Sequence, residues 1–392
     1  MSKEREGTLI SAELKNTLFE YHRTRGFVLY DTFPLVSNDS TVLFTNATIT
    51  PFKHFFDGDV VPHNYALVQH CLRVGGGAGE LETARINPNY SSLFEMFGSG
   101  FFGCQHLEAV EYFIGILDSV GLPMKNLRFV VSEASPFSNV LLTHGVAESS
   151  IFTIEENGEF WHEWRFGKNG LIGSGLTVVF ARNNMEAKSV DEMAADYETF
   201  VEIGNLIHVY GRVSGNEVLP IPHEGFDVGM GVARLAIILQ NKTLYELPPF
   251  NGLMEVVAAQ MASLTNKSVD NGTLRVIVDH LRSIDALIQE GLRPSNKKHA
   301  FVLRKLIRSL LEIIWVSAGR IISPTEMISA FAQYDTPGIA PLVESVVSEE
   351  GRTFCKVLEQ GRKVLAKNSG LDSETLKSTY GIRQSLIPLL RE

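Results

Sequence analysis

Two glycine clusters, each beside an arginine, are the parts of this sequence best suited to chemistry. The first cluster, residues 75–79, follows Arg73 after one residue, and the second, residues 225–231, precedes Arg234. Glycine lets the backbone approach a ligand closely, and the planar fork of an arginine holds phosphate oxygens in pairs. The two clusters therefore predict sites for a phosphate-bearing ligand.

Neither cluster fits a common phosphate-binding loop. The sequence has no G-x-x-x-x-G-K-[ST], and the first cluster lacks the third glycine and helix start of a dinucleotide fingerprint. A turn with a solvated arginine would explain either cluster alone. However, Arg73, Asp227 and Arg234 all lie in glycine-rich, otherwise apolar motifs, where a charged residue needs a partner. We therefore favour ligand binding for these three residues.

The surrounding elements indicate an antiparallel sheet. Runs rich in β-branched and aromatic residues predict strands at 27–30, 41–44, 127–131, 176–181 and 199–210. Helical spacing of apolar residues predicts helices over 11–25 and 107–120. Because strands follow one another with few helices between them, an antiparallel sheet flanked by helices fits better than a parallel one.

The pattern becomes helical from about residue 240. It is clearest over 274–288, where apolar residues recur at helical spacing before Gly291 and Pro294. We therefore expect an α+β fold with two domains: a sheet domain at 1–240 and an all-helical domain at 241–392.

The composition is that of an ordinary globular protein. Of 392 residues, 44% are hydrophobic and 20% charged, and neither a signal peptide nor a run of about 18 apolar residues is present. We expect a cytoplasmic protein without a membrane partner.

The three cysteines are too far apart in sequence for a close-spaced zinc motif. The net charge of −10 argues against a surface that binds nucleic acid over its whole area, but allows a local basic patch.

Several motifs, taken in order, resemble those of alanyl-tRNA synthetases. They are FTNATITPFKHFF (44–56), CLRVGGGAGELE (71–82), LFEMFGSGFFG (93–103), VEIGN (201–205), FDVGMGVAR (226–234), LRVIVDHLRS (274–283) and EGLRPSNKKHAFVLRKLIRS (290–309). The resemblance implies a class II catalytic domain followed by the helical domain that this family uses to bind the tRNA acceptor stem.

The resemblance also implies an ATP site with Mg²⁺. Arg73 matches the arginine that holds the α-phosphate and the amino acid carboxylate, and Arg234 matches the arginine on the γ-phosphate. Phe94 would pack against adenine. Glu202 would be a magnesium ligand, since Mg²⁺ prefers hard oxygen ligands together with phosphates. A core role for Phe94 and a solvated edge-strand position for Glu202 remain alternatives.

For the amino acid, the resemblance implies that Asp227 pairs with the substrate ammonium and that Trp161, Asn205 and Gly229 belong to the pocket. Trp161 could instead be a core aromatic. Strict strand alternation would place Glu202 and Asn205 on opposite faces of the sheet. A β-bulge near Gly204 would bring them to one face.

The sequence departs from the family in several places. Residues 77–80 lack the lysine and the further basic residues of the family's loop, and Gly204 replaces a tryptophan, which predicts a larger pocket if that position lines the site. Ser385 replaces an aspartate that reads the acceptor-stem wobble pair. Because the chain ends soon after, we expect no editing domain and no C-terminal oligomerisation module.

A basic stretch in the helical domain could contact the acceptor. It contains the predicted acceptor-binding residues Arg293, Asn296, Lys297, Arg304 and Arg308. A solvated helix face is an equally good interpretation of this stretch.

These observations predict ATP-dependent activation of a small amino acid, alanine or a close analogue, to an aminoacyl adenylate. The acceptor would be either a tRNA or the thiol of a carrier protein. The alternative is a non-catalytic, synthetase-like binding or regulatory protein, although a protein that only binds would not need two phosphate-holding arginines.

Overall fold

The computed structural model describes residues 3–58, 60–74, 82–133, 135–154, 163–165, 170–325, 327–328, 341–367 and 373–391. The chain forms two compact units. The first comprises Met1–Arg73 and Asn87–Leu247, and the second comprises Val74–Ile86 and Pro248–Glu392. The domain bounds 1–240 and 241–392 stay a prediction, and the second unit also takes in Val74–Ile86.

In its described residues, the first unit is built on a nine-stranded sheet with the order β1-β2-β3-β9-β8-β7-β4-β5, and β6 pairs with β7. The strands are β1 (Val28–Tyr30), β2 (Tyr65–Leu72), β3 (Leu93–Phe102), β4 (Leu127–Ser132), β5 (Ile151–Ile154), β6 (Glu163–Arg165), β7 (Leu171–Ala181), β8 (Phe200–Ser214) and β9 (Glu217–Gly231). Only β1–β2 and β4–β5 pair in parallel among these strands. The predicted α+β fold with a mainly antiparallel sheet is therefore confirmed.

One predicted strand is wrong. Residues 41–44 contribute only an isolated bridge between Val36 and Phe44. The backbone turns here because Asp39 accepts hydrogen bonds from the backbone and side chain of Thr41, at 2.8 and 2.7 Å. Such local side-chain hydrogen bonds compete with strand pairing.

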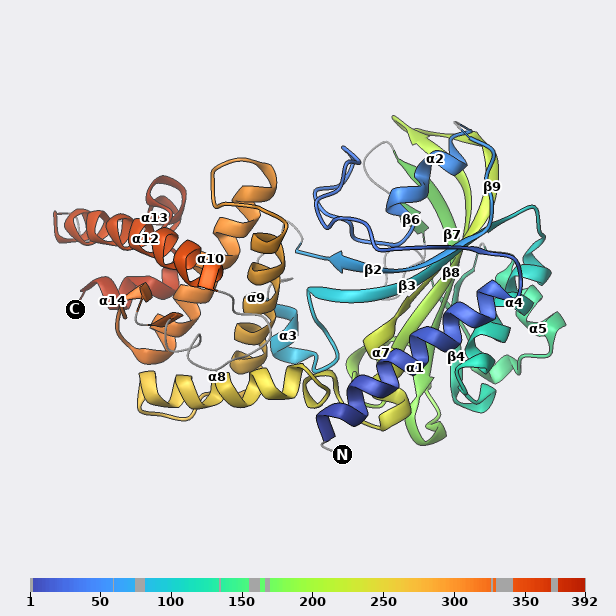
Figure 1. Cartoon of the computed structure of the whole chain (residues 1–392), viewed down its shortest axis with the longest axis horizontal. Coiled ribbons are helices and arrows are strands. Elements are labelled where there is room, and N and C mark those ends of the chain that lie inside the picture. Colours follow the sequence, from blue (N-terminus) through green and yellow to red (C-terminus); the bar gives the residue numbers. More distant parts are fainter. Residues whose placement is uncertain are drawn as a thin grey trace. The chain divides into compact units, whose positions relative to one another are not determined.

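Helices α1, α4 and α7 cover one face of the sheet (Figure 1). The helices of this unit are α1 (Lys3–Arg23), α2 (Lys53–Phe56), α4 (His106–Ser119), α5 (Phe137–His144), α6 (Val190–Ala195) and α7 (Val232–Gln240). The covered face is apolar, with Leu18, Phe97 and Phe113 fully buried. Hydrophobic burial against these helices therefore fixes one side of the sheet.

The opposite face is covered in part by α2 and the turn before it. Phe52 and Phe56 pack there against Tyr65 and Ile207 of the sheet in one buried cluster. Beyond this cluster the neighbouring strands β3 and β9 are paired at glycines, with Gly98 opposite Gly229. At Gly98 the side chain of Thr48 fills the space that a Cβ would need, whereas a Cβ on Gly229 would meet only the ends of the Asn205 and Met96 side chains.

The second unit is helical and is organised around α9. Its helices are α3 (Thr83–Ile86), α8 (Phe250–Thr265), α9 (Asn271–Gln289), α10 (Lys298–Ala318), α12 (Pro341–Lys367), α13 (Ser373–Tyr380) and α14 (Ile387–Arg391). Helix α9 contacts α3, α8, α10 and α12, and the apolar residues that predicted it are buried. Among the described helices, none combines the length and apolar character needed to cross a membrane.

Candidate active site

The two predicted phosphate-binding arginines lie at the same edge of the sheet. Arg73 follows β2, and Arg234 is the third residue of α7, which begins directly after β9. Both β2 and β9 pair antiparallel with β3, so they run in the same direction and end at the same edge. Phe94 lies near the start of β3 at this edge. The register of three strands therefore brings these residues together.

Arg73 is positioned by its backbone and by an aromatic ring. Its backbone N–H donates to the Ser92 carbonyl at 2.9 Å, and its Nε donates to the Asn46 carbonyl at 3.1 Å. The guanidinium carbon lies 5.2 Å from the centre of the Phe94 ring, within the range of a cation–π contact. The side chain stays exposed, with N–H groups available to a ligand.

Arg234 is held by Glu202. Its Nη1 lies 3.0 Å from Oε2 of Glu202 and 3.2 Å from the backbone carbonyl oxygen of the same residue. Both side chains are about one-third exposed, at 31% and 32%. The ion pair therefore orients Arg234 while leaving part of its guanidinium accessible.

A β-bulge resolves the conflict between Glu202 and Asn205. On β8, Gly204 pairs with Val178 and Glu202 with Val179, so Ile203 is an extra residue. One extra residue reverses the alternation of side chains beyond it. The bulge required by the sequence argument is therefore present, next to Gly204.

Asp227 is a buried carboxylate on the glycine-lined face. Its residue is 3% exposed, and Oδ1 has no hydrogen-bond partner in the described part of the chain. Burial raises the pKa of this carboxyl well above its usual value. A buried carboxylate without a partner is costly unless a ligand completes it. This site suits a cation.

The remaining predicted pocket residues lie beside Asp227 or outside the described residues. Asn205 pairs with Gly229, and a Cβ on Gly229 would lie 3.2 Å from Oδ1 of Asn205 and 3.3 Å from Sδ of Met96. Glycine at 229 therefore leaves space above the backbone between the side chains of Asn205 and Met96. Trp161 and the loop at 77–80 are outside the described residues.

Gly204 does not enlarge the pocket. A Cβ there would lie 2.6 Å from Cγ of Met230 and would also collide with the carbonyl oxygen of Gly229. The space that a larger side chain would need is filled by β9. The expectation of a larger pocket from the tryptophan-to-glycine change is therefore not supported.

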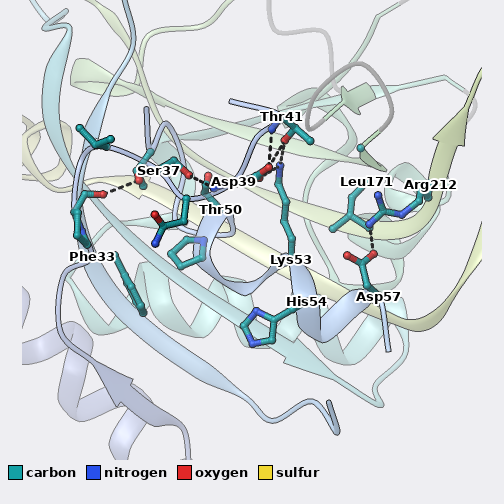
Figure 2. Close-up of a pocket in the computed structure, with 16 residues that line it drawn as sticks. Phe33, Ser37, Asp39, Thr41, Thr50, Lys53, His54, Asp57, Leu171 and Arg212 are labelled. Atoms are coloured by element: carbon teal, nitrogen blue, oxygen red, sulfur yellow. Dashed lines mark hydrogen bonds and ion pairs between the residues drawn. The ribbon is translucent and has the colours of Figure 1, made fainter. Parts of the chain in front are cut away.

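A separate pocket of about 400 Å³ is lined by residues between Phe33 and Asp57 and by Gly170, Leu171 and Arg212 (Figure 2). Its cations are already paired. Nζ of Lys53 lies 2.6 Å from Oδ2 of Asp39, and Arg212 pairs with Asp57. None of the predicted site residues lines this pocket. With its cations neutralised, it is poorly suited to a phosphate group.

The basic stretch of the helical unit is partly tied up internally. Arg308 Nε donates to Oε1 of Glu350 at 2.7 Å, and Arg304 Nε lies 3.3 Å from Oε2 of the same carboxylate, whose side chain is 5% exposed. Arg304 also donates to the side chain of Asn296. These contacts give Arg304 and Arg308 a structural role, whereas Arg293 and Lys297 are exposed.

Ser385, which the sequence resemblance aligned with the wobble-pair reader, is also engaged within the helical unit. Its hydroxyl donates to Oε1 of Glu312. The other oxygen, Oε2, lies 3.1 Å from Nη1 of Arg383. The serine thus belongs to an internal hydrogen-bond network.

Sequence reasoning missed two features. The first is Tyr65, whose ring lies over Gly100. Gly100 is in turn the cross-strand partner of Asp227. The second is α3, which is anchored to α9 because Arg275 donates to the carbonyl oxygens of Ala84 and Arg85 at 2.8 and 2.6 Å. The sequence around Arg275 did not indicate this contact, because the two carbonyl groups lie about 190 residues away along the chain.

Comparison with known proteins shows the family of this chain. Residues 13–384 match the family model described as tRNA synthetases class II (A). An alanine-tRNA ligase of Nitrosomonas europaea is 29% identical, and the match covers 95% of this chain but 44% of the ligase, so the chain spans less than half of that relative's length.

Two solved structures are also similar. The Desulfitobacterium hafniense pyrrolysyl-tRNA synthetase PylSc has 12% identity and a TM-score of 0.34, over 60% of this chain and 71% of that one. The Entamoeba histolytica asparaginyl-tRNA synthetase has 8% identity and a TM-score of 0.37, over 63% and 67%. Since the family model extends over nearly the whole chain, this protein belongs to the class II tRNA synthetase family.

Proposed function

We propose that this protein activates a small amino acid, alanine or a close analogue, with ATP to form an aminoacyl adenylate. The observation that carries the proposal is Asp227, a buried carboxylate whose Oδ1 has no hydrogen-bond partner in the described part of the chain, beside Gly229. It supplies a site for the ammonium of an amino acid. Arg73 and Arg234, at one edge of the same sheet, supply cations for phosphates.

The ATP side of the site would be formed by four residues. Arg73 would hold the α-phosphate, Arg234 the γ-phosphate, and Phe94 would pack against adenine. Glu202 is the candidate Mg²⁺ ligand. The described residues hold no group of three or more metal-ligating side chains, so the phosphates would have to supply most ligands of the ion.

The amino acid side would be formed by Asp227, Asn205, Gly229 and Trp161. Asp227 would pair with the ammonium, and Asn205 would contact the substrate above Gly229. With its ammonium group bound to Asp227, the amino acid would direct its own carboxylate toward the α-phosphate of ATP. Attack of a carboxylate oxygen forms the new O–P bond as the bond to pyrophosphate breaks, and Arg73 stabilises the charge that develops.

The acceptor is proposed to be a tRNA or a carrier-protein thiol, docked on the exposed part of the basic stretch. Arg293 and Lys297 are exposed there, beside Phe301, which is 50% exposed. Arg304, Arg308 and Asn296 would support this surface through their contacts with each other and with Glu350.

Pyrophosphate exchange tests the proposal. The purified protein should incorporate labelled pyrophosphate into ATP when one small amino acid is added. Arg73→Ala should lower the rate by about a hundredfold or more, as the loss of a charge-stabilising group does. Arg182→Ala is the matched control, because Arg182 binds Lys242 and Asn241 away from the site. Ligand binding without exchange for any amino acid would instead favour the non-catalytic alternative.

A further inference from the structure

The ring of Tyr65 occupies the place where residue 100 would carry a side chain. A Cβ on Gly100 would lie 2.6 Å from the Tyr65 hydroxyl oxygen and would also collide with Cε1 and Cζ of the ring. Tyr65 is fully buried, and its ring stacks on Phe52 with 3.7 Å between centres. Gly100 thus allows a tyrosine to reach across β3 toward β9.

The hydroxyl of Tyr65 reaches the neighbourhood of Asp227. Gly100 is the direct cross-strand partner of Asp227 on β9, and paired residues point to the same face with Cβ positions about 5 Å apart. Burial raises the pKa of Tyr65 well above its usual value, and the nearby Asp227 carboxylate raises it further. The two oxygen-bearing groups therefore share one small volume.

The Tyr65 hydroxyl and one oxygen of Asp227 are unpaired as far as the described residues show. The Tyr65 hydroxyl and Oδ1 of Asp227 are buried, and neither has a partner within the described part of the chain. A buried tyrosine hydroxyl normally finds a partner. A phenylalanine would fill the same apolar space next to Phe52 without that cost. The hydroxyl is thus unexplained by packing.

We propose that Tyr65 is a second ammonium-binding residue, whose hydroxyl oxygen accepts a hydrogen bond from the amino group of the substrate that pairs with Asp227. An ammonium carries three N–H donors, so it can satisfy both oxygens at once. This inference rests on the proposed amino acid site and assigns to it a residue that the sequence resemblance did not indicate.

The test is a comparison of two ligands on two variants. The ligands are alanyl sulfamoyl adenosine, a stable analogue of the adenylate, and its counterpart with hydrogen in place of the amino group. The variants are Tyr65→Phe and Tyr112→Phe. Tyr112 packs against Phe27 and Phe101 on the helix-covered face, so it controls for loss of a tyrosine hydroxyl in this sheet. Affinities are measured by titration calorimetry.

Tyr65→Phe should weaken binding of the amino-bearing analogue about tenfold to a hundredfold, as expected for a hydrogen bond to a charged group. It should leave the counterpart unchanged, and Tyr112→Phe should change neither affinity. Gly100→Ala, which displaces the Tyr65 ring, should reproduce the loss while the protein stays folded by circular dichroism.

The outcomes separate the inference from the proposed function. If wild-type protein prefers the amino-bearing analogue but Tyr65→Phe retains that preference, the Tyr65 inference is wrong and the amino acid site stands. Equal weakening of both analogues would assign Tyr65 to packing and also overturn the inference. If wild-type protein binds neither analogue, the proposed function fails and the inference fails with it.

Discussion

Arg234 contacts Glu202 through two separate acceptors, a carboxylate oxygen at 3.0 Å and the backbone carbonyl oxygen at 3.2 Å. The backbone carbonyl lies next to the bulge in β8, where Ile203 is the extra residue. Because both side chains are about one-third exposed, the ion pair adds little to stability. Its main effect is to fix the direction of the arginine.

Replacement of Glu202 should therefore affect ATP more than folding. Glu202→Gln removes the charge and keeps the size, so we expect a KM for ATP raised about tenfold and a free energy of unfolding within about 0.5 kcal/mol of wild type. Pyrophosphate exchange at varied ATP and Mg²⁺ measures the first quantity, and urea unfolding the second. Glu224→Gln is the control, since Glu224 pairs with His208 at 3.0 Å on an exposed part of β9. An unchanged KM for ATP in Glu202→Gln would show that Glu202 does not contribute to ATP binding.

Asp227→Asn should separate function from stability. At neutral pH the folded protein must keep a buried carboxyl whose pKa is raised, while the unfolded chain ionises it freely. Stability therefore falls as pH rises from the unfolded pKa toward the raised folded one. The amide avoids this cost, so the variant should melt a few degrees higher at pH 7 and bind the amino acid at least tenfold more weakly, with ATP affinity unchanged. Calorimetry with each ligand tests this, and equal losses for both ligands would make Asp227 structural.

The sequence indicated the charged residues of the candidate site but not the residues that surround them. Arg73, Asp227 and Arg234 stand out because they interrupt glycine-rich apolar motifs. Tyr65 does not stand out, because a tyrosine in an apolar strand looks like a core residue. Its position beside Asp227 depends on the register of β2, β3 and β9, which pairs Tyr65 with Gly100 and Gly100 with Asp227.

The same limit applies to the helical unit. The helix over 274–288 was predicted because periodicity is a local property. The basic stretch was also visible, but Glu350, which neutralises Arg304 and Arg308, is more than 40 residues away in the sequence. Only the packing of α12 against α10 shows which cations are engaged.

His22 should make the sheet unit sensitive to acid. The His22 side chain is fully buried, and its Nδ1 forms a hydrogen bond with the Leu18 carbonyl oxygen at 2.7 Å. Its ring contacts the rings of Phe27, Phe97, Tyr21 and Tyr112. Burial lowers its pKa from 6.5 to about 4, and nearby Arg25 also disfavours the charged form. The unfolded chain thus binds the proton first as pH falls.

The resulting stability loss should begin below pH 6.5 and reach about 3 kcal/mol near pH 4. His22→Gln, which cannot titrate, should flatten this part of the pH profile even if it lowers stability overall. Urea midpoints between pH 4 and 7 measure the slope. His144→Gln, on the half-buried end of α5, is the matched histidine control.

The exposed and the paired cations of the basic stretch should behave differently. Arg308→Ala leaves Glu350, whose side chain is 5% exposed, without its closest ion partner, so we expect a loss of about 3 kcal/mol of stability. Arg293→Ala with Lys297→Ala changes two exposed residues, so stability and pyrophosphate exchange should hold while transfer to the acceptor falls. The double variant Lys356→Ala with Lys363→Ala, exposed on α12, controls for net charge. Equal transfer by both double variants would exclude the stretch as a docking surface.

Ser385 bears on the choice between the two proposed acceptors, because its hydroxyl donates to Glu312 within the helical unit. A good base contact contributes roughly 1–3 kcal/mol, so without an acidic reader at this position discrimination at the wobble pair should relax about tenfold to a hundredfold. We therefore expect poor charging of tRNA(Ala) and better transfer to another acceptor, with the thiol of a carrier protein as the first candidate. Labelled amino acid transfer to total tRNA and to carrier proteins of the same organism compares the two. Ser385→Asp restores an acidic group at this position, so it should raise charging of tRNA(Ala). Efficient charging of tRNA(Ala) by the wild-type protein, lost when the wobble pair is changed, would instead assign the protein to tRNA aminoacylation.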